Sequence, residues 1–340
     1  MGGPGHEAQD RPTAAPGAVH SIVDAEARLE VRALDGGPLG PPPGLGTILL
    51  GVHRAGPLPR SGLEVFDVLL SADPAAPAPW VGVAPGDLEA AITALQVMVA
   101  IRPVASLALT QVLRLSLTLS FEAALTVESL AYSMLLAGCE FRDWRRENPV
   151  RNRPASDAPR VRLDRDGDTL VIALSRPDAR NAVDARMRDE LVEALEFAAI
   201  DPGAPPVRLV GDGAAYCAGG DLDEFGTASD PAAAHVVRMA RSPARLAYLQ
   251  RDRLHARLHG ACIGAGIEIP AAAGRVTARP DSWFQLPEVA MGLIPGAGGT
   301  ATLPRRIGRH RTAWLALTGA RLDAAHALEW GLIDAMEHDG

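Results

Sequence analysis

The sequence predicts an α/β fold, and the prediction depends on the pattern of its second half. Residues 161–163 and 170–174 resemble two paired strands around the turn Asp166-Gly167-Asp168. Residues 184–200 then place apolar side chains at helical spacing, and residues 207–210 follow as a short buried strand. Further helical runs and Gly-rich loops alternate to the end of the chain, which is typical of an α/β domain.

The part before residue 160 is organised differently. Residues 1–20 are rich in Gly, Pro and Ala, and we expect a disordered tail there. Residues 21–83 predict a small α/β or β-rich segment, with strand-like runs at 47–52 and 63–70 and no recognisable chemistry. Residues 84–146 predict helices. Residues 147–159 contain three prolines and predict a linker to a domain over residues 160–340.

Two residues indicate where helices begin and end in this region. Asp87 is a candidate N-cap for a helix that begins near Leu88. Pro103 lacks an N–H and should interrupt or end that helix. Further helices are expected over residues 106–119 and 122–136.

Composition excludes several classes of function. The chain has 340 residues, 47% of them hydrophobic, which is ample for a sizeable core. Its net charge of −8 argues against nonspecific nucleic-acid binding. The most apolar stretch, residues 91–119, is interrupted by charges and a proline, so no membrane span is expected. Three cysteines, Cys139, Cys217 and Cys262, match no zinc or redox spacing and indicate a reduced, cytoplasmic protein.

The chemistry of the chain is concentrated between residues 259 and 300. Small residues at Gly264, Ala265 and Gly266 allow another molecule to approach the backbone. If a helix starts there, its first N–H groups can bind an oxyanion. Glu268 and Glu288 add two carboxylates nearby. Backbone donors beside two carboxylates indicate acid–base chemistry next to a polarised carbonyl.

The run Tyr216-Cys217-Ala218-Gly219-Gly220-Asp221 resembles the crotonase (enoyl-CoA hydratase/isomerase) superfamily. The resemblance extends over residues 160–336 through four ordered motifs: Leu174-Ser175-Arg176-Pro177 with Asn181-Ala182, residues 259–268, Leu286-Pro287-Glu288 and residues 295–300. It implies a spiral core of ββα units with a helical cap or trimerisation region. It also implies an acyl-CoA thioester substrate, no cofactor beyond the coenzyme A of the substrate, no metal, and a homotrimer or dimer of trimers.

The resemblance also assigns roles to residues. The backbone N–H groups of Gly220 and Ala265 would form an oxyanion hole, and Glu268 and Glu288 would be catalytic. Residues that would bind substrate or coenzyme A are Arg180, Ala218, Asp221, Leu222, Asp223 and Gly264.

Several of these positions have a structural alternative. Asp221 is also a candidate cap for a helix near Leu222. Arg176 and Arg180 are either phosphate contacts or solvated loop charges. Pro270, two residues after Glu268, is expected to delay the start of the helix to about Ile267 or to kink it.

The order of segments departs from that of the family. Its members continue into a C-terminal helical tail, whereas here residues 103–144, ahead of the core, resemble that tail through Arg114, Glu128-Ser129, Tyr132, Glu140-Phe141 and Trp144. We therefore expect the cap to have been moved forward, packing on its own core or on a neighbour. The leading function is an enoyl-CoA hydratase. The alternatives are an enoyl-CoA isomerase of the same family and a non-catalytic acyl-CoA-binding protein.

Overall fold

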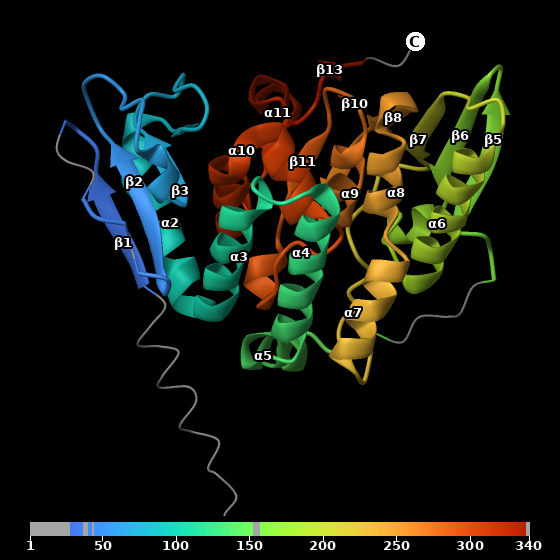
Figure 1. Cartoon of the computed structure of the whole chain (residues 1–340), viewed down its shortest axis with the longest axis horizontal. Coiled ribbons are helices and arrows are strands. Elements are labelled where there is room, and N and C mark those ends of the chain that lie inside the picture. The colour runs from blue at the N-terminus through green and yellow to red at the C-terminus, as the bar shows by residue number, and fades with distance from the viewer. Residues whose placement is uncertain (1–27, 37–39, 43, 152–156, 338–340) are drawn as a thin grey trace, which may run out of the picture.

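The computed structural model of the protein describes residues 28–36, 40–42, 44–151 and 157–337. The tail expected over residues 1–20 lies outside these ranges, as does part of the expected linker. The described elements form an elongated molecule in which a small sheet stands at one end and a larger sheet at the other (Figure 1). Helices fill the space between the two sheets.

The small sheet contains four parallel strands in the order β1-β2-β3-β4: Arg28–Ala33, Thr47–His53, Val68–Ser71 and Val81–Gly82. Its strands alternate between two cores. Leu50 and Leu70 join the main core on the helical side, whereas Leu49 and Leu69 pack with Trp80 in a smaller core on the opposite face. The strand predicted over residues 63–70 is correct only in its second half, because Leu63–Val65 forms a 3-10 turn.

The helical region contains α2 (Leu88–Ile101), α3 (Pro103–Ser116), α4 (Phe121–Leu136) and α5 (Cys139–Glu147). The break predicted at Pro103 is confirmed. Asp87 stands at the N-cap position of α2, but its side chain accepts no capping hydrogen bond. No single helix among the described residues is long and apolar enough to cross a membrane. Residues 85–116 together reach that length, but they are bent by 110° at the break.

The larger sheet has six strands in the order β13-β10-β8-β7-β6-β5, all parallel to their neighbours except β5. In chain order they are Val161–Asp166, Thr169–Leu174, Val207–Gly211, Leu254–Leu258, Arg275–Ala278 and Ala335–Met336. In a third sheet the central strand β11 (Trp283–Gln285) pairs with β9 (Ala261–Ile263) in parallel and with β12 (Leu322–Asp323) in antiparallel orientation. The α/β class and the hairpin around Gly167 are therefore confirmed.

The remaining helices are α6 (Ala185–Ile200), α7 (Pro231–Ala240), α8 (Pro243–Leu249), α9 (Ala265–Glu268), α10 (Gly299–Thr318) and α11 (Ala324–Trp330). Asp184 caps α6 by accepting a hydrogen bond from the Met187 N–H. α10 is broken at Gly308, whose φ of 77° lies outside the helical range.

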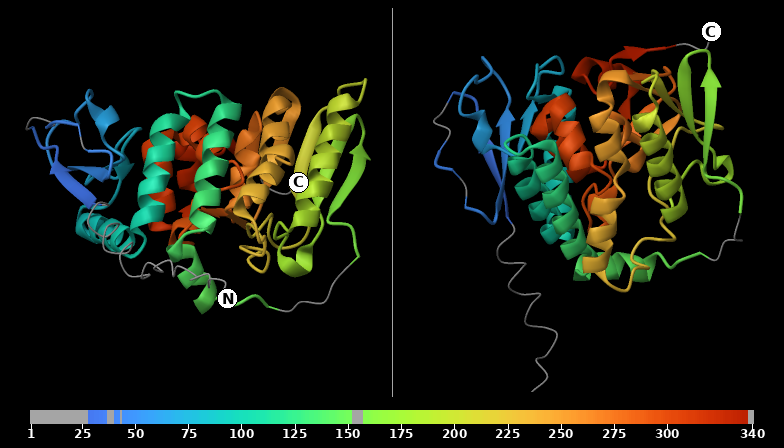
Figure 2. Two further views of the ribbon diagram at one scale, coloured as in Figure 1. Left: turned by 60° about the horizontal axis from the view of Figure 1, so that its bottom comes forward. Right: turned by 45° about the vertical axis from the view of Figure 1, so that its right-hand side comes forward.

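The first and second halves of the chain share one hydrophobic core, which runs from Leu50 to Ile333. Figure 2 shows α3 and α4 lying over α10. The small sheet is fastened to this assembly by buried Asp67, which accepts hydrogen bonds from Arg114 Nε at 2.8 Å and Nη2 at 2.6 Å. Asp67 also accepts from the Leu49 N–H. Because this ion pair is bidentate, it fixes the orientation of the start of β3 relative to α3.

We predict that a chain beginning at Arg160 will not fold as a stable unit, because α10 would lose the apolar cover of α3 and α4. Size-exclusion chromatography and thermal unfolding should show aggregates or no cooperative transition. Adding residues 1–159 as a separate chain should restore solubility. A soluble, cooperatively unfolding fragment would show that the two halves are independent modules.

Candidate active site

Two loops of the core meet at the level of their backbones. The Cys217 N–H donates to the Ala261 carbonyl at 3.1 Å, and the Ile263 N–H donates to the Cys217 carbonyl at 3.0 Å. A Cβ atom at Gly266 would lie 2.4 Å from the Cys217 carbonyl oxygen, so only glycine permits this approach. This contact places Gly220, three residues after Cys217, and Ala265, two residues after Ile263, at the same cavity.

This cavity, of about 610 Å³, contains the predicted oxyanion donors. Ala265 is the first residue of α9, so its N–H has no partner within the helix. Among the described residues, neither this N–H nor that of Gly220 donates a hydrogen bond. Both groups are therefore available to an oxygen atom in the cavity.

Glu268 is held by the start of α10. Its Oε2 atom accepts hydrogen bonds from the Ala297 N–H at 2.8 Å and the Gly299 N–H at 2.9 Å, which leaves Oε1 for other partners. The late helix start expected from Pro270 is wrong, since α9 begins at Ala265. The expected disruption is correct: α9 ends at Glu268, and Pro270 opens a separate 3-10 turn where no N–H is needed.

Glu288 approaches Glu268 from a second loop. It opens a 3-10 turn after Pro287, is buried, and has an Oε2 atom without a hydrogen-bond partner. A Cβ atom at Gly264 would lie 2.4 Å from Glu288 Oε1 and 3.6 Å from Glu268 Oε1. The two carboxylates therefore face each other beside Gly264, whose φ of 49° also favours glycine.

A third buried carboxylate, Glu128, comes from α4 and was not predicted as a site residue. Its oxygens accept from the Gly298 N–H at 2.7 Å, the Thr300 N–H at 2.8 Å and the Thr300 hydroxyl at 2.7 Å. Its position in the sequence carried a signal. Phe121, Leu125, Glu128 and Tyr132 recur at helical spacing, so Glu128 lies on a stripe of otherwise apolar or aromatic residues.

Burial governs the protonation of all three carboxyl groups. Desolvation raises the pKa of Glu128 to about 7 and that of Glu288 to about 8. It also raises the pKa of Glu268 well above its ordinary value, and the neighbouring charges of Glu288 and Glu128 add to the effect. Near neutral pH, the site can therefore hold protonated carboxyl groups and act as a proton donor as well as an acceptor.

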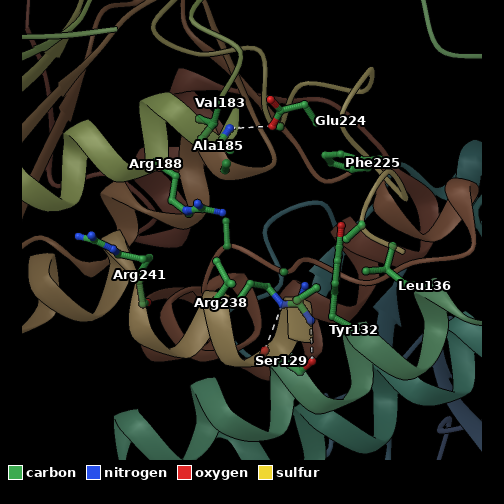
Figure 3. Close-up of a pocket in the computed structure, with 18 of the residues that line it drawn as sticks. Ser129, Tyr132, Leu136, Val183, Ala185, Arg188, Glu224, Phe225, Arg238 and Arg241 are labelled. Atoms are coloured by element: carbon green, nitrogen blue, oxygen red, sulfur yellow. Dashed lines mark hydrogen bonds between the residues drawn. The ribbon is translucent and has the colours of Figure 1, made fainter. Parts of the chain in front are cut away.

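The outer wall of the cavity is formed by α4, α6 and α7 (Figure 3). Tyr132 and Ser129 come from α4, Arg188 from α6, and Arg238 from α7. The guanidinium of Arg238 lies 4.8 Å from the centre of the Tyr132 ring. Sequence reasoning did not identify Arg238, because it lies outside the motifs that resemble the family.

The predicted coenzyme A contacts are only partly brought to this cavity. Asp221 lines it, but Arg180, Ala218, Leu222, Asp223 and Gly264 do not. No helix begins after Asp221; the chain turns there, and Asp221 accepts instead from Arg176 Nη1 at 2.7 Å. This guanidinium also lies 3.2 Å from Asp184, so Arg176 is used inside the fold, whereas Arg180 is exposed.

Cys217 and Cys262 are buried beside the donor loops. Desolvation raises the pKa of Cys217 to about 12 and that of Cys262 well above its ordinary value, so neither is poised as a nucleophile. The half-buried His259 ring contacts the Gly213 carbonyl at 2.9 Å. In the described parts of the chain, no group of three or more His, Cys, Asp or Glu side chains could hold a metal ion.

Comparison with known proteins adds an independent observation. Residues 165–338 match the enoyl-CoA hydratase/isomerase family. The 2,3-dehydroadipyl-CoA hydratase of Escherichia coli is 34% identical over 164 residues, which cover 48% of this chain and 64% of that protein. The mevalonyl-coenzyme A hydratase of Aspergillus fumigatus is 32% identical, with 50% and 63% covered. The chain thus spans less than two thirds of these relatives.

A solved structure, the enoyl-CoA hydratase from Thermoplasma volcanium, superposes with a TM-score of 0.50 at 31% sequence identity. The match covers 54% of this chain and 73% of that one. The fold expected for the core is therefore confirmed.

We predict that the free energy of unfolding falls as the pH rises from about 5 to 8. The folded-state pKa values of Glu128 and Glu288 lie above the ordinary value of 4.5, so the folded protein binds more protons than the unfolded chain in this window. Glu128→Gln should flatten this slope, as urea unfolding at several pH values would measure. Glu122→Gln, an exposed position on the same helix, should leave it unchanged. Equal slopes in both variants would refute the assignment.

Proposed function

Because the chain belongs to the enoyl-CoA hydratase/isomerase family, we propose that it is an enoyl-CoA hydratase. It adds water across the 2,3-double bond of a 2-enoyl-CoA or removes water in the reverse direction. The observation that most supports this proposal is the facing pair Glu268 and Glu288, both buried beside two backbone N–H groups that donate no hydrogen bond among the described residues. A hydration needs one group to activate water and another to deliver a proton, and this pair supplies both.

In the proposed mechanism, the N–H groups of Gly220 and Ala265 bind the thioester oxygen. They stabilise the negative charge that develops when water attacks the β-carbon. Glu268, whose Oε2 is anchored by α10, orients and deprotonates the water through Oε1. Glu288 in its protonated form donates to the α-carbon, and its raised pKa suits this role. At the end of this step Glu268 carries the proton taken from water and Glu288 is ionised, so a proton passes from Glu268 to Glu288 before the next turnover.

We also propose that α3, α4 and α5 take the place of the family's C-terminal tail. Two observations support this. α3 and α4 pack on α10 within the same chain, and α4 contributes Glu128, Ser129 and Tyr132 to the cavity. A non-catalytic binding protein would not require three desolvated carboxyl groups at the site, which are costly to bury.

An isomerase of the same family would use a single base to move a double bond. Incubation with a 2-enoyl-CoA followed by product mass separates these possibilities. A gain of one water supports the hydratase, an unchanged mass with a shifted double bond supports the isomerase, and an unaltered substrate supports binding alone.

We predict that Glu268→Gln and Glu288→Gln each reduce the hydration rate by about 10²-fold or more, since positioned acid–base groups contribute that much. Steady-state kinetics on a 2-enoyl-CoA would measure the effect, with circular dichroism to check folding. Glu224→Gln is the matched control, because Glu224 lines the same cavity but is bonded to the Ala185 N–H. Near-normal turnover in either active-site variant would remove that residue from the mechanism.

We predict that Ala265→Pro lowers kcat by about 10²-fold, the cost typical of losing one oxyanion donor. Proline is tolerated at the first position of a helix, so the change removes the N–H with little demand on α9. Ala265→Gly keeps the N–H and should retain most of the activity. If the proline variant folds and turns over substrate as fast as the glycine variant, this N–H is not an oxyanion donor.

A further inference from the structure

The cavity wall contains a cation without a counter-ion. Arg238 on α7 is partly buried, and among the described residues no carboxylate lies within ion-pair distance of its guanidinium. It is held instead by neutral groups of α4: Nε donates to Ser129 Oγ at 3.1 Å, and Nη2 donates to the Ser129 carbonyl at 3.2 Å and to the Ser133 hydroxyl. Its Nη1 atom has no partner among these contacts.

None of the described acidic side chains that line the cavity, Glu288 included, forms an ion pair with Arg238, although the charge of Glu128 acts on it from a longer distance. Glu128 and Glu268 are bonded to backbone N–H groups of residues 297–300, and Glu224 to the Ala185 N–H. Asp184 and Asp221 pair with Arg176, and Asp230 caps α7. Desolvation lowers the pKa of Arg238, as expected for a cation moved out of water without an ion-pair partner.

The guanidinium is also fixed in orientation. The Tyr132 ring lies 4.8 Å from it, and the bonds to Ser129 and Ser133 hold it on one side (Figure 3). A partly buried, rigidly held guanidinium with an unused N–H edge is the arrangement that binds a carboxylate or phosphate.

We propose that Arg238 binds a carboxylate at the far end of the acyl group, so that the preferred substrate is the coenzyme A thioester of a dicarboxylic acid. This inference depends on the proposed binding of acyl-CoA thioesters. We favour the acyl carboxylate over a phosphate of coenzyme A because Arg238 packs on Tyr132, whose ring lies directly against Gly296. The next residue, Ala297, donates its N–H to Glu268. An anion bound by Arg238 therefore lies in the part of the cavity that would hold the acyl group, not the nucleotide of coenzyme A.

The test compares two saturated acyl-CoA thioesters of equal length by isothermal titration calorimetry on the full chain. One ends in a carboxylate and the other in a methyl group. Neither can be hydrated, so the result does not depend on catalysis. The wild-type protein should bind the carboxylate-terminated thioester about 10- to 100-fold more tightly, as expected of a charge-assisted hydrogen bond. Equal affinities would overturn the proposal.

Variants identify the residue responsible. Arg238→Gln should abolish the preference, and Arg238→Lys, which keeps the charge but not the planar fork, should retain part of it. Arg241→Gln is the matched control, because Arg241 lines the same cavity but its guanidinium points away from it (Figure 3). A preference that persists in a folded Arg238→Gln protein would refute the assignment. If that variant does not fold, a full preference in Arg238→Lys would also refute it.

Thioesters of pantetheine lack the nucleotide phosphates. They therefore show whether Arg238 binds the acyl carboxylate or a phosphate of coenzyme A. An acyl site predicts that the carboxylate preference survives in pantetheine thioesters. If Arg238→Gln weakens both coenzyme A thioesters equally and leaves both pantetheine thioesters unaffected, Arg238 binds a phosphate and the proposal is wrong. Failure of every thioester to bind would instead contradict the proposed function itself.

Discussion

The first turn of α10 is the point on which the site depends. Its free backbone N–H groups bind two carboxylates that are far apart in the sequence: Glu268 from α9 and Glu128 from α4. The positive end of the helix favours negative charge there, and the N–H groups satisfy oxygens that would otherwise be buried without partners. One turn of α10 thereby fixes the position of α9 relative to that of α4.

This arrangement sets two electrostatic effects against each other. Desolvation and mutual repulsion favour the protonated forms of the three carboxyl groups, whereas the N–H groups of residues 297–300 favour the ionised forms of Glu128 and Glu268. Glu288 receives no hydrogen bond from that turn and has an unpartnered oxygen. The carboxylates therefore differ in their surroundings although they share a cavity, and this difference can assign one of them to accept a proton and another to donate it.

The sequence was informative where local chemistry decides the structure. The hairpin around Gly167 and the break at Pro103 both follow from residue types at short spacing. Hydrogen bonds between residues far apart in the sequence could not be predicted in this way. Glu128 reaches residues 298 and 300, and Arg238 binds Ser129, contacts that span more than a hundred positions. Asp221 was misjudged as a helix cap for the same reason, since its partner Arg176 is supplied by a distant loop.

The position of α3 and α4 ahead of the core has a consequence for biosynthesis. As the chain leaves the ribosome, these helices emerge first, but the surface that covers their apolar faces belongs to α10, near residue 300. These helices cannot complete their packing until α10 has been made, and Glu128 remains without its N–H partners for the same interval. Until then, the nascent chain exposes the faces of α3 and α4 that α10 later covers, and exposed apolar surface of this kind favours chaperone binding during synthesis.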